Sequence, residues 1–305
     1  ESMKLFVEAE IRKMGKKNLW IGPSLGDWLA MGKGIAWQAM HNNPVSNAFI
    51  VHDLKVISET AERLGKREDA ARYRRQLAAT TDAYIKKFVS KNGIVAKDYQ
   101  SAYIMALKYV LPEGELREMV KKNFVANIRK NGLQTGFFAT EHLLPLLVEA
   151  GEQKLAYDVL LQENCPGWMY QVKCGATTTW ERWDALKPDG TVNEEKMAGS
   201  GENMVSFNHY AFGSVGEFYY QYILGIRPEK PGFAKLHFAP YPDERLGGVS
   251  GSYLSVAGKI ESAWRYEPDG CHIRLATPVE AVVLLPDGRS ENVPAGTYEW
   301  TVKRP

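Results

Sequence analysis

The stretch NAFIVHDLKVISETAERLGK, residues Asn47 to Lys66, carries a strong structural signal. Its apolar side chains recur every three or four residues, which is the spacing of one face of an α-helix. That face comprises Ile50, Leu54, Ile57, Ala61 and Leu64. Gly65 stands at a position where glycine often ends a helix in the left-handed conformation. The stretch therefore predicts a helix that packs on a core and ends near residue 65.

The residues that follow predict a second helix, packed back against the first. REDAARYRRQLAATTDAYIKKFV, residues 67–89, has acids in its first turn and lysines in its last, which suits the helix dipole. Other helical patterns cover residues 1–15, 100–111, 113–131, 140–150, 152–162 and 203–224. Several of the links are only a few residues long, so we expect neighbouring helices to form antiparallel hairpins.

Two connections in this helical region are much longer than the others. They cover residues 16–46 and 163–202, and both are rich in tryptophan and glycine. Structureless links of that length in a compact helical domain are usually functional. We therefore look for the functional site in these two segments.

The pattern changes near GIRPEKPG, residues 225–232. Beyond it the sequence consists of short alternating runs separated by two Pro-Asp-Gly turns, at residues 268–270 and 286–288. Such runs predict an antiparallel sheet, folded as a small β-sandwich. The fold class is therefore mainly α followed by β. We expect a helical domain over residues 1–225 and a C-terminal β domain over residues 226–305.

Composition excludes several classes of protein. The 305 residues are 24% charged and 45% hydrophobic, with a net charge of +2, which does not indicate a nucleic-acid or membrane-surface binder. No apolar run reaches the roughly 18 residues that span a bilayer. The histidines and the three cysteines lack metal-ligand spacing, and no glycine-rich phosphate loop is present. We expect reduced thiols, no metal and no cofactor, and a cytoplasmic rather than a secreted protein.

The most unusual segment is CGATTTWERWD, residues 174–184, in the second long connection. Glu181 lies there between Trp180 and Trp183. Apolar rings desolvate a carboxylate, and aromatic faces beside carboxylates suit sugars, which present a C–H face and hydroxyl groups. Glu181 is therefore a candidate catalytic residue. The alternative is that it forms a structural ion pair with Arg182 or another base.

Two further segments hold candidate ligand-binding residues. In SFNHYAFGSVGE, residues 206–217, Asn208 and His209 stand at the start of a predicted helix, where they can reach a ligand hydroxyl. The alternative for His209 is a core histidine packed by neighbouring phenylalanines. In GDWLA, residues 26–30, Asp27 and Trp28 again pair a hydrogen-bond acceptor with a stacking face. The two tryptophans beside Glu181 complete the expected substrate-binding set.

Taken together, these segments resemble the bacterial α-L-rhamnosidases of glycoside hydrolase family 78. The matching segments are GDWLA, TGFFATEHLLPLLVEAG, GATTTWERWD, SFNHYAFGSVGEFYYQYILGI and PGFAKLHFAP, and they occur in the family's order. The resemblance implies an (α/α)6 barrel followed by a β-sandwich, and an inverting hydrolase that removes terminal rhamnose from plant glycosides or polysaccharides. It also implies that Glu181 is the general base and that Trp28 and His209 line the sugar pocket.

The sequence departs from the family pattern in two respects. A complete barrel has twelve helices, whereas about eight helical patterns are present, and the family's general-acid segment finds no match. We therefore expect a partial barrel that supplies the base but not the acid, with a missing N-terminal portion of the same polypeptide as its partner. Two alternatives remain: another (α/α)6 exo-glycosidase, and a non-catalytic carbohydrate-binding protein.

Overall fold

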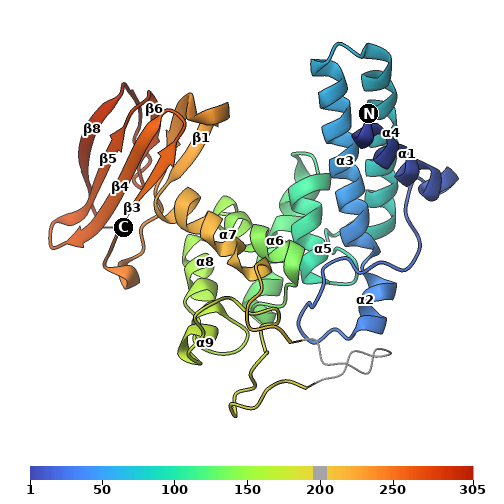
Figure 1. Cartoon of the computed structure of the whole chain (residues 1–305), viewed down its shortest axis with the longest axis horizontal. Helices are drawn as coiled ribbons and strands as arrows, with labels where there is room; N and C mark the ends of the chain where they lie inside the picture. The colour runs from blue at the N-terminus through green and yellow to red at the C-terminus, as the bar shows by residue number, and fades with distance from the viewer. Residues whose placement is uncertain (195–204, 305) are drawn as a thin grey trace. The chain divides into compact units, whose positions relative to one another are not determined.

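The computed structural model describes residues 1–194 and 205–304 (Figure 1). Its contacts divide the chain into two compact units, Glu1–Phe212 and Gly213–Pro305. The first strand begins at Ile226, as the change of pattern near residue 225 indicates. The last helical turns before that strand nevertheless group with the second unit. The domain boundary at residue 225 stays a prediction.

The first unit is mainly helical, and its described residues contain no β structure beyond the isolated bridges Val89–Val95 and Leu186–Val192. Its α-helices are α1 (Ser2–Met14), α2 (Ile35–His41), α3 (Asn43–Arg63), α4 (Arg67–Phe88), α5 (Gln100–Met105), α6 (Glu115–Asn131), α7 (Phe137–Glu149), α8 (Gln153–Leu160) and α9 (Trp168–Lys173). A π-helical segment, Ala106–Val110, extends α5. Helices α2 and α9 lie inside the two long connections, which are therefore not structureless.

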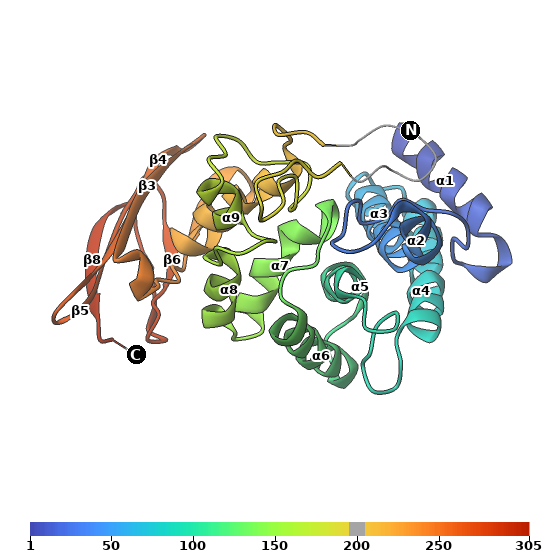
Figure 2. The same ribbon diagram turned by 90° about the horizontal axis from the view of Figure 1, so that it is seen from below.

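The helices form successive hairpins, as the short links predict. Helix α3 packs on α4, α5 on α6, and α7 on α8. Helix α5 also contacts both α3 and α7, so these three form an inner row (Figure 2). Helices α4, α6 and α8 lie outside that row. The described part of the unit is thus an arc of hairpins in two layers, which is the partial barrel expected from the sequence.

Helix α3 shows why the hairpin folds. Its predicted apolar face is buried at Leu54 and Ile57 and packs with Tyr73 of α4. Gly65 has a φ of +70° and its N–H donates to the carbonyl of Glu62, which ends the helix as expected. Leu64 was predicted to belong to the buried face but is 66% exposed, because the helix ends one residue before it.

Some predicted helix bounds were wrong. Helix α7 begins at Phe137 rather than at residue 140, because its first turn is capped by a side chain from a distant segment. The helix predicted at 203–224 is much shorter. Residues 205–210 are not helical, and a 3₁₀ turn, α10 (Val215–Phe218) and a π-helical segment follow. Residues 203 and 204 of that prediction lie outside the described residues.

The second unit contains two four-stranded sheets. Their orders are β1-β2-β6-β7 and β3-β4-β5-β8. The rings of Phe238 in β2 and Trp300 in β8 stack at 6.1 Å, so the two sheets meet as a sandwich. The strands are β1 (Ile226–Lys230), β2 (Lys235–Phe238), β3 (Gly248–Ser255), β4 (Gly258–Glu267), β5 (Gly270–Thr277), β6 (Ala281–Leu284), β7 (Ser290–Val293) and β8 (Gly296–Val302).

One pairing in this sandwich departs from the antiparallel prediction. Strand β2 pairs with β6 in parallel, with Leu236 opposite Ala281, whereas the other named pairs are antiparallel. The cause is topological. The chain leaves β2, builds β3, β4 and β5 of the second sheet, and returns to the first sheet as β6 in the same direction. Alternating sequence patterns set strand positions but not this crossover.

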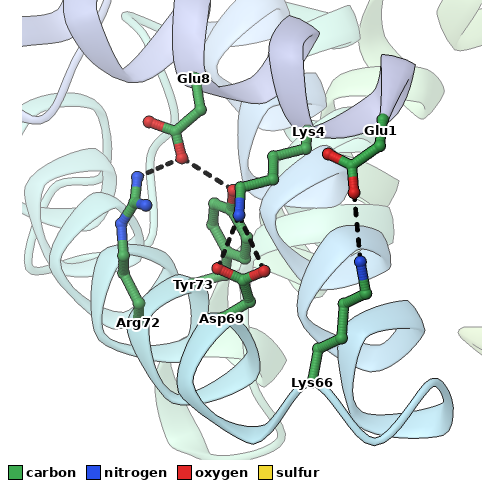
Figure 3. A network of polar contacts seen from close by, with 7 residues as sticks. All are labelled: Glu1, Lys4, Glu8, Lys66, Asp69, Arg72 and Tyr73. Carbon is green, nitrogen blue, oxygen red and sulfur yellow. Dashed lines mark hydrogen bonds and ion pairs between the residues drawn. The ribbon is translucent and has the colours of Figure 1, made fainter.

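Polar contacts hold α1 against α4. The Lys4 ammonium lies 2.9 Å from both carboxylate oxygens of Asp69, and Glu8 accepts hydrogen bonds from Arg72 and from the Tyr73 hydroxyl (Figure 3). Lys66, just before α4, forms an ion pair with Glu1, just before α1. Because most of these charges are exposed to water, which screens them, each pair contributes little to stability.

Helix α1 also brings an uncompensated carboxyl group against α3. Burial, followed by the nearby charge of Asp53, raises the pKa of Glu10 to about 7. One carboxyl oxygen of Glu10 is buried without a hydrogen-bond partner. Because the folded-state pKa lies above the unfolded value, this group favours folding below about pH 4.5, and that contribution is lost as the pH rises through 7.

We predict that Glu10→Gln removes this pH dependence. The variant should gain roughly 1 kcal/mol of stability over the wild type at pH 8, after allowance for solvent screening, and little at pH 4. Thermal unfolding midpoints at the two pH values measure the difference. Glu59→Gln, on the exposed side of α3, is the matched control. An equal shift at both pH values would contradict the prediction.

Candidate active site

The start of α7 is the point at which the predicted site segments meet. Asp27, from the first long connection, is fully buried. Its carboxylate accepts hydrogen bonds from the N–H groups of Gly136 at 2.7 Å, Phe138 at 2.7 Å and Ala139 at 3.0 Å. These amides have no partner within the helix. A side chain that lies more than one hundred residues earlier in the sequence therefore caps α7.

Electrostatics at this cap act in two directions. Burial raises the pKa of Asp27, whereas the hydrogen bonds from the three backbone amides lower it. The positive end of the α7 dipole favours a negative charge at the same place. The position is also sterically tight. A Cβ atom on Gly136 would lie 2.2 Å from the carbonyl oxygen of Trp28, so only glycine fits there.

The second long connection reaches the same helix start. The indole N–H of Trp183 donates to the carbonyl of Thr135 at 2.9 Å. The Trp183 ring is fully buried and stacks on Phe212 at 3.8 Å, with Trp168 edge-on at 5.0 Å. Both faces of this ring are therefore occupied by protein or closed to solvent. Trp183 fixes the loop that carries Glu181.

The segments around Glu181 and His209 lie side by side. The Glu181 N–H donates to the carbonyl of Ser206, and the His209 N–H donates to the carbonyl of Thr179, both at 2.9 Å. The hydroxyl of Thr179 donates back to the carbonyl of His209, and that of Thr178 donates to the carbonyl of Phe207. The threonines of the CGATTTWERWD segment thus hold it against the SFNHYAFGSVGE segment.

His209 connects this pair of segments to α7 and to Trp28. Its ring lies 4.8 Å from that of Phe137, and the Phe137 N–H donates to the carbonyl of Trp28 at 3.0 Å. His209 also stacks on Tyr210, and its Nδ1 atom accepts from the Ala211 N–H. The alternative role, a core histidine packed by Phe207 and Phe212, is not seen among these contacts, and the ring is only half-buried.

Glu181 itself is 8% exposed. Within residues 1–194 and 205–304, no hydrogen bond or ion pair reaches its carboxylate. Arg182, the neighbour expected as an alternative partner, is directed elsewhere. Its guanidinium makes two hydrogen bonds to Asp184, at 2.9 and 3.2 Å, and Asn193 donates to the same carboxylate at 2.8 Å. Glu181 therefore does not form the structural ion pair with Arg182 that was the alternative to a catalytic role.

The remaining predicted residues differ in exposure. Trp28 is half-buried and Asn208 is exposed, so both side chains are accessible. Trp180 is buried, with its edge against Phe207 and Tyr170, and its N–H donates to the side-chain oxygen of Gln171. The structure therefore joins all seven predicted residues through one set of contacts. The substrate-binding roles assigned to them stay predictions.

Sequence reasoning missed the residues that join these segments. Thr135, Gly136 and Phe137 were placed before a helix at residue 140, although Thr-Gly ahead of an apolar run is a helix-start signal. No sequence motif singled out Gln171 as part of the site. Its role depends on the position of Trp180 in the folded chain.

The described residues give no indication of a metal or membrane site. Nowhere in residues 1–194 and 205–304 do three or more His, Cys, Asp or Glu side chains gather as a metal site would require. Among the same residues, no helix is long and apolar enough to cross a bilayer. The three cysteines are free thiols.

Two family models match the chain, one for each part. Residues 1–223 match the bacterial alpha-L-rhamnosidase 6 hairpin glycosidase domain, and residues 225–298 match the bacterial alpha-L-rhamnosidase C-terminal domain. Among curated relatives, the alpha-L-rhamnosidase of Alteromonas sp. (strain LOR) is 33% identical over 272 residues, which cover 86% of this chain and 29% of the relative. The chain spans 25% to 29% of the length of the three curated relatives it matches.

Solved structures of alpha-L-rhamnosidases also align with this chain. The alpha-L-rhamnosidase of Streptomyces avermitilis, crystallised with L-rhamnose, aligns with a TM-score of 0.88 and 29% identity, covering 99% of this chain and 30% of that one. The native enzyme from Aspergillus terreus aligns with a TM-score of 0.82 and 30% identity, covering 91% of this chain and 33% of that one.

We predict that Asp27→Asn destabilises the helical unit by about 2 kcal/mol, because an amide nitrogen would replace one acceptor oxygen and face a backbone N–H. Thermal unfolding followed by circular dichroism measures the loss. Asp82→Asn, on the exposed side of α4, is the matched control and should change little. An unchanged midpoint for Asp27→Asn would show that the cap is not needed.

Proposed function

We propose, on the premise that this chain belongs to the bacterial α-L-rhamnosidase family, that the protein it forms part of hydrolyses terminal α-L-rhamnosides with Glu181 as general base. The observation that carries the proposal is the state of the Glu181 carboxylate. It is buried, and no described residue donates to it. A buried carboxylate without a partner costs free energy, so such a group is usually retained for a ligand or a reacting water.

The neighbouring carboxylates are less suited to this role. Asp27 accepts three backbone amides at the start of α7. Asp184 accepts from Arg182 and Asn193. Each of these two carboxylates already accepts three hydrogen bonds from protein donors. Glu181 is the member of this group of three whose oxygens remain available to a water molecule.

In an inverting reaction, Glu181 would take a proton from the water that attacks the anomeric carbon. A second carboxyl group would protonate the departing oxygen from the opposite side. The two groups would stand roughly 6.5–9.5 Å apart, which leaves room for that water. We propose that this acid comes from a part of the protein outside residues 1–305, because the described carboxylates beside Glu181 serve structural roles.

The other predicted residues would bind and orient the sugar. Trp28 offers a half-buried ring for the C–H face of the pyranose, and His209 and Asn208 offer groups for its hydroxyls. The buried rings of Trp180 and Trp183 would act differently. They hold the Glu181 loop in place and keep bulk water from the carboxylate, which strengthens electrostatic interactions there.

The test is steady-state kinetics of Glu181→Gln in the full-length protein. The two side chains are nearly isosteric, so the fold should be kept. With an aryl α-L-rhamnoside as substrate, kcat should fall by about 10²- to 10⁴-fold while KM changes little, because only the proton transfer is lost. Glu163→Gln is the matched control. It removes an exposed glutamate paired with Lys173, and kcat should stay near the wild-type value.

Other outcomes would overturn parts of the proposal. Near-normal kcat in Glu181→Gln would exclude Glu181 as the base. A wild-type protein that binds rhamnose without hydrolysing any rhamnoside would indicate a carbohydrate-binding protein. Hydrolysis of another sugar's glycoside in preference to the rhamnoside would indicate a different (α/α)6 exo-glycosidase.

A further inference from the structure

A large cavity lies beside the candidate site, within the helical unit. It has a volume of about 1190 Å³ and is bounded by the first long connection, the end of α4 and the loop before α5. Its wall includes the aromatic side chains of Trp37, Phe88 and Tyr99. None of the seven predicted site residues lines it. A cavity of this size accommodates one or two sugar rings or an aromatic group.

The cavity wall carries an excess of positive charge. Lys33, Lys86, Lys87 and Lys97 line it, against a single carboxylate, that of Asp98. Four positive charges and one negative charge leave a formal excess of three. In the described part of the chain, none of these four lysines forms an ion pair, and Asp98 already accepts a hydrogen bond from the Tyr103 hydroxyl. Lys33 stands 4.6 Å above the Trp37 ring.

The loop that carries Lys97 is held in an unfavourable conformation. Ala96, Lys97 and Asp98 have φ values of +45°, +57° and +70°, which cost side-chain-bearing residues about 1 kcal/mol or more each. Hydrogen bonds enforce the conformation: the Ala96 N–H donates to Phe88, and the Asn127 amide donates to the Asp98 carbonyl. Backbone strain of this kind gathers at ligand sites.

The cavity shares structural parts with the candidate active site. Helix α2 contributes Trp37 and His41 to the cavity wall, while its buried Gln38 accepts from the Leu29 N–H of the GDWLA segment. Asn42, just after α2, donates to the Leu25 carbonyl and accepts from the Tyr99 hydroxyl. Gln134, which also lines the cavity, directly precedes the Thr135–Phe137 segment to which Trp183 and Trp28 bind. The cavity wall and the candidate sugar site are therefore joined by hydrogen bonds through α2 and by the chain segment 134–137.

We infer that this cavity binds the part of the substrate beyond the rhamnose, and that it selects an aglycone bearing a carboxylate. The inference rests on the proposed function, since it assigns the group to which the departing oxygen belongs. The lysines supply the charge complement for the carboxylate. The aromatic wall supplies apolar contact for a ring, and the enforced loop holds Lys97 in place before the ligand arrives.

The probe is a matched pair of substrates, 4-carboxyphenyl and 4-carbamoylphenyl α-L-rhamnoside. The two aglycones have similar size but differ in charge. The carbamoyl group withdraws electrons more strongly than the ionised carboxylate, so leaving-group reactivity alone favours the carbamoyl substrate. The full-length wild type should show the higher kcat/KM with the carboxylate, and the difference should shrink in about 0.5 M salt. Lys97→Gln and Lys86→Gln should each lower the carboxylate-to-carbamoyl ratio of kcat/KM about two- to fivefold, through a KM that rises more for the carboxylate substrate than for the carbamoyl substrate.

Lys91→Gln is the matched control, because Lys91 lies in the same loop region but does not line the cavity. It should leave the ratio unchanged. Equal kcat/KM for the two substrates in the wild type would overturn the inference. The same conclusion would follow if the lysine variants lowered kcat/KM for both substrates by the same factor. If the wild type hydrolyses neither substrate, its rate with the aryl α-L-rhamnoside used in the Glu181→Gln test decides the cause: no rate there means that the proposed function fails, whereas a normal rate overturns the inference about the cavity.

Discussion

The carboxylate of Asp27, bonded to the first amides of α7, is the contact on which the rest of the site depends. It ties the first long connection to an inner helix of the hairpin arc. The same helix start receives the indole N–H of Trp183 through Thr135 and the ring of His209 through Phe137. Three segments that are far apart in the sequence are thereby brought to one turn of backbone. Gly136 permits the approach because a Cβ atom would collide with the Trp28 carbonyl.

Three carboxylates near that turn differ in their partners. Asp27 accepts hydrogen bonds from backbone amides, and Asp184 accepts them from Arg182 and Asn193. The Glu181 carboxylate accepts none from the described residues. All are of the same chemical type, and two of them stand within four residues of one another. What separates a structural carboxylate from a chemically available one here is the set of donors that the fold places around it. The arginine next to Glu181 in sequence stabilises Asp184 instead.

The aromatic residues are divided in a similar way. Trp183 and Trp180 were expected to flank the sugar, and in the folded chain their rings are buried against Phe212, Trp168, Phe207 and Tyr170. Trp28 keeps part of its surface exposed. A tryptophan beside a candidate catalytic carboxylate can therefore act indirectly, by fixing the backbone that carries the carboxylate. The lysine-lined cavity adds a second environment beside this one, with the opposite charge preference.

The sequence by itself determined the hairpins, the change from helix to strand near residue 225 and the segments that form the site. These features depend on local periodicity, capping residues and short motifs, which act within a few residues. Only the tertiary structure decided where α7 begins, which side chain caps it and which partner Arg182 takes. It also decided that β2 and β6 run parallel. Each of these depends on contacts between distant segments, and no local pattern encodes which donor will lie beside which acceptor once the chain has folded.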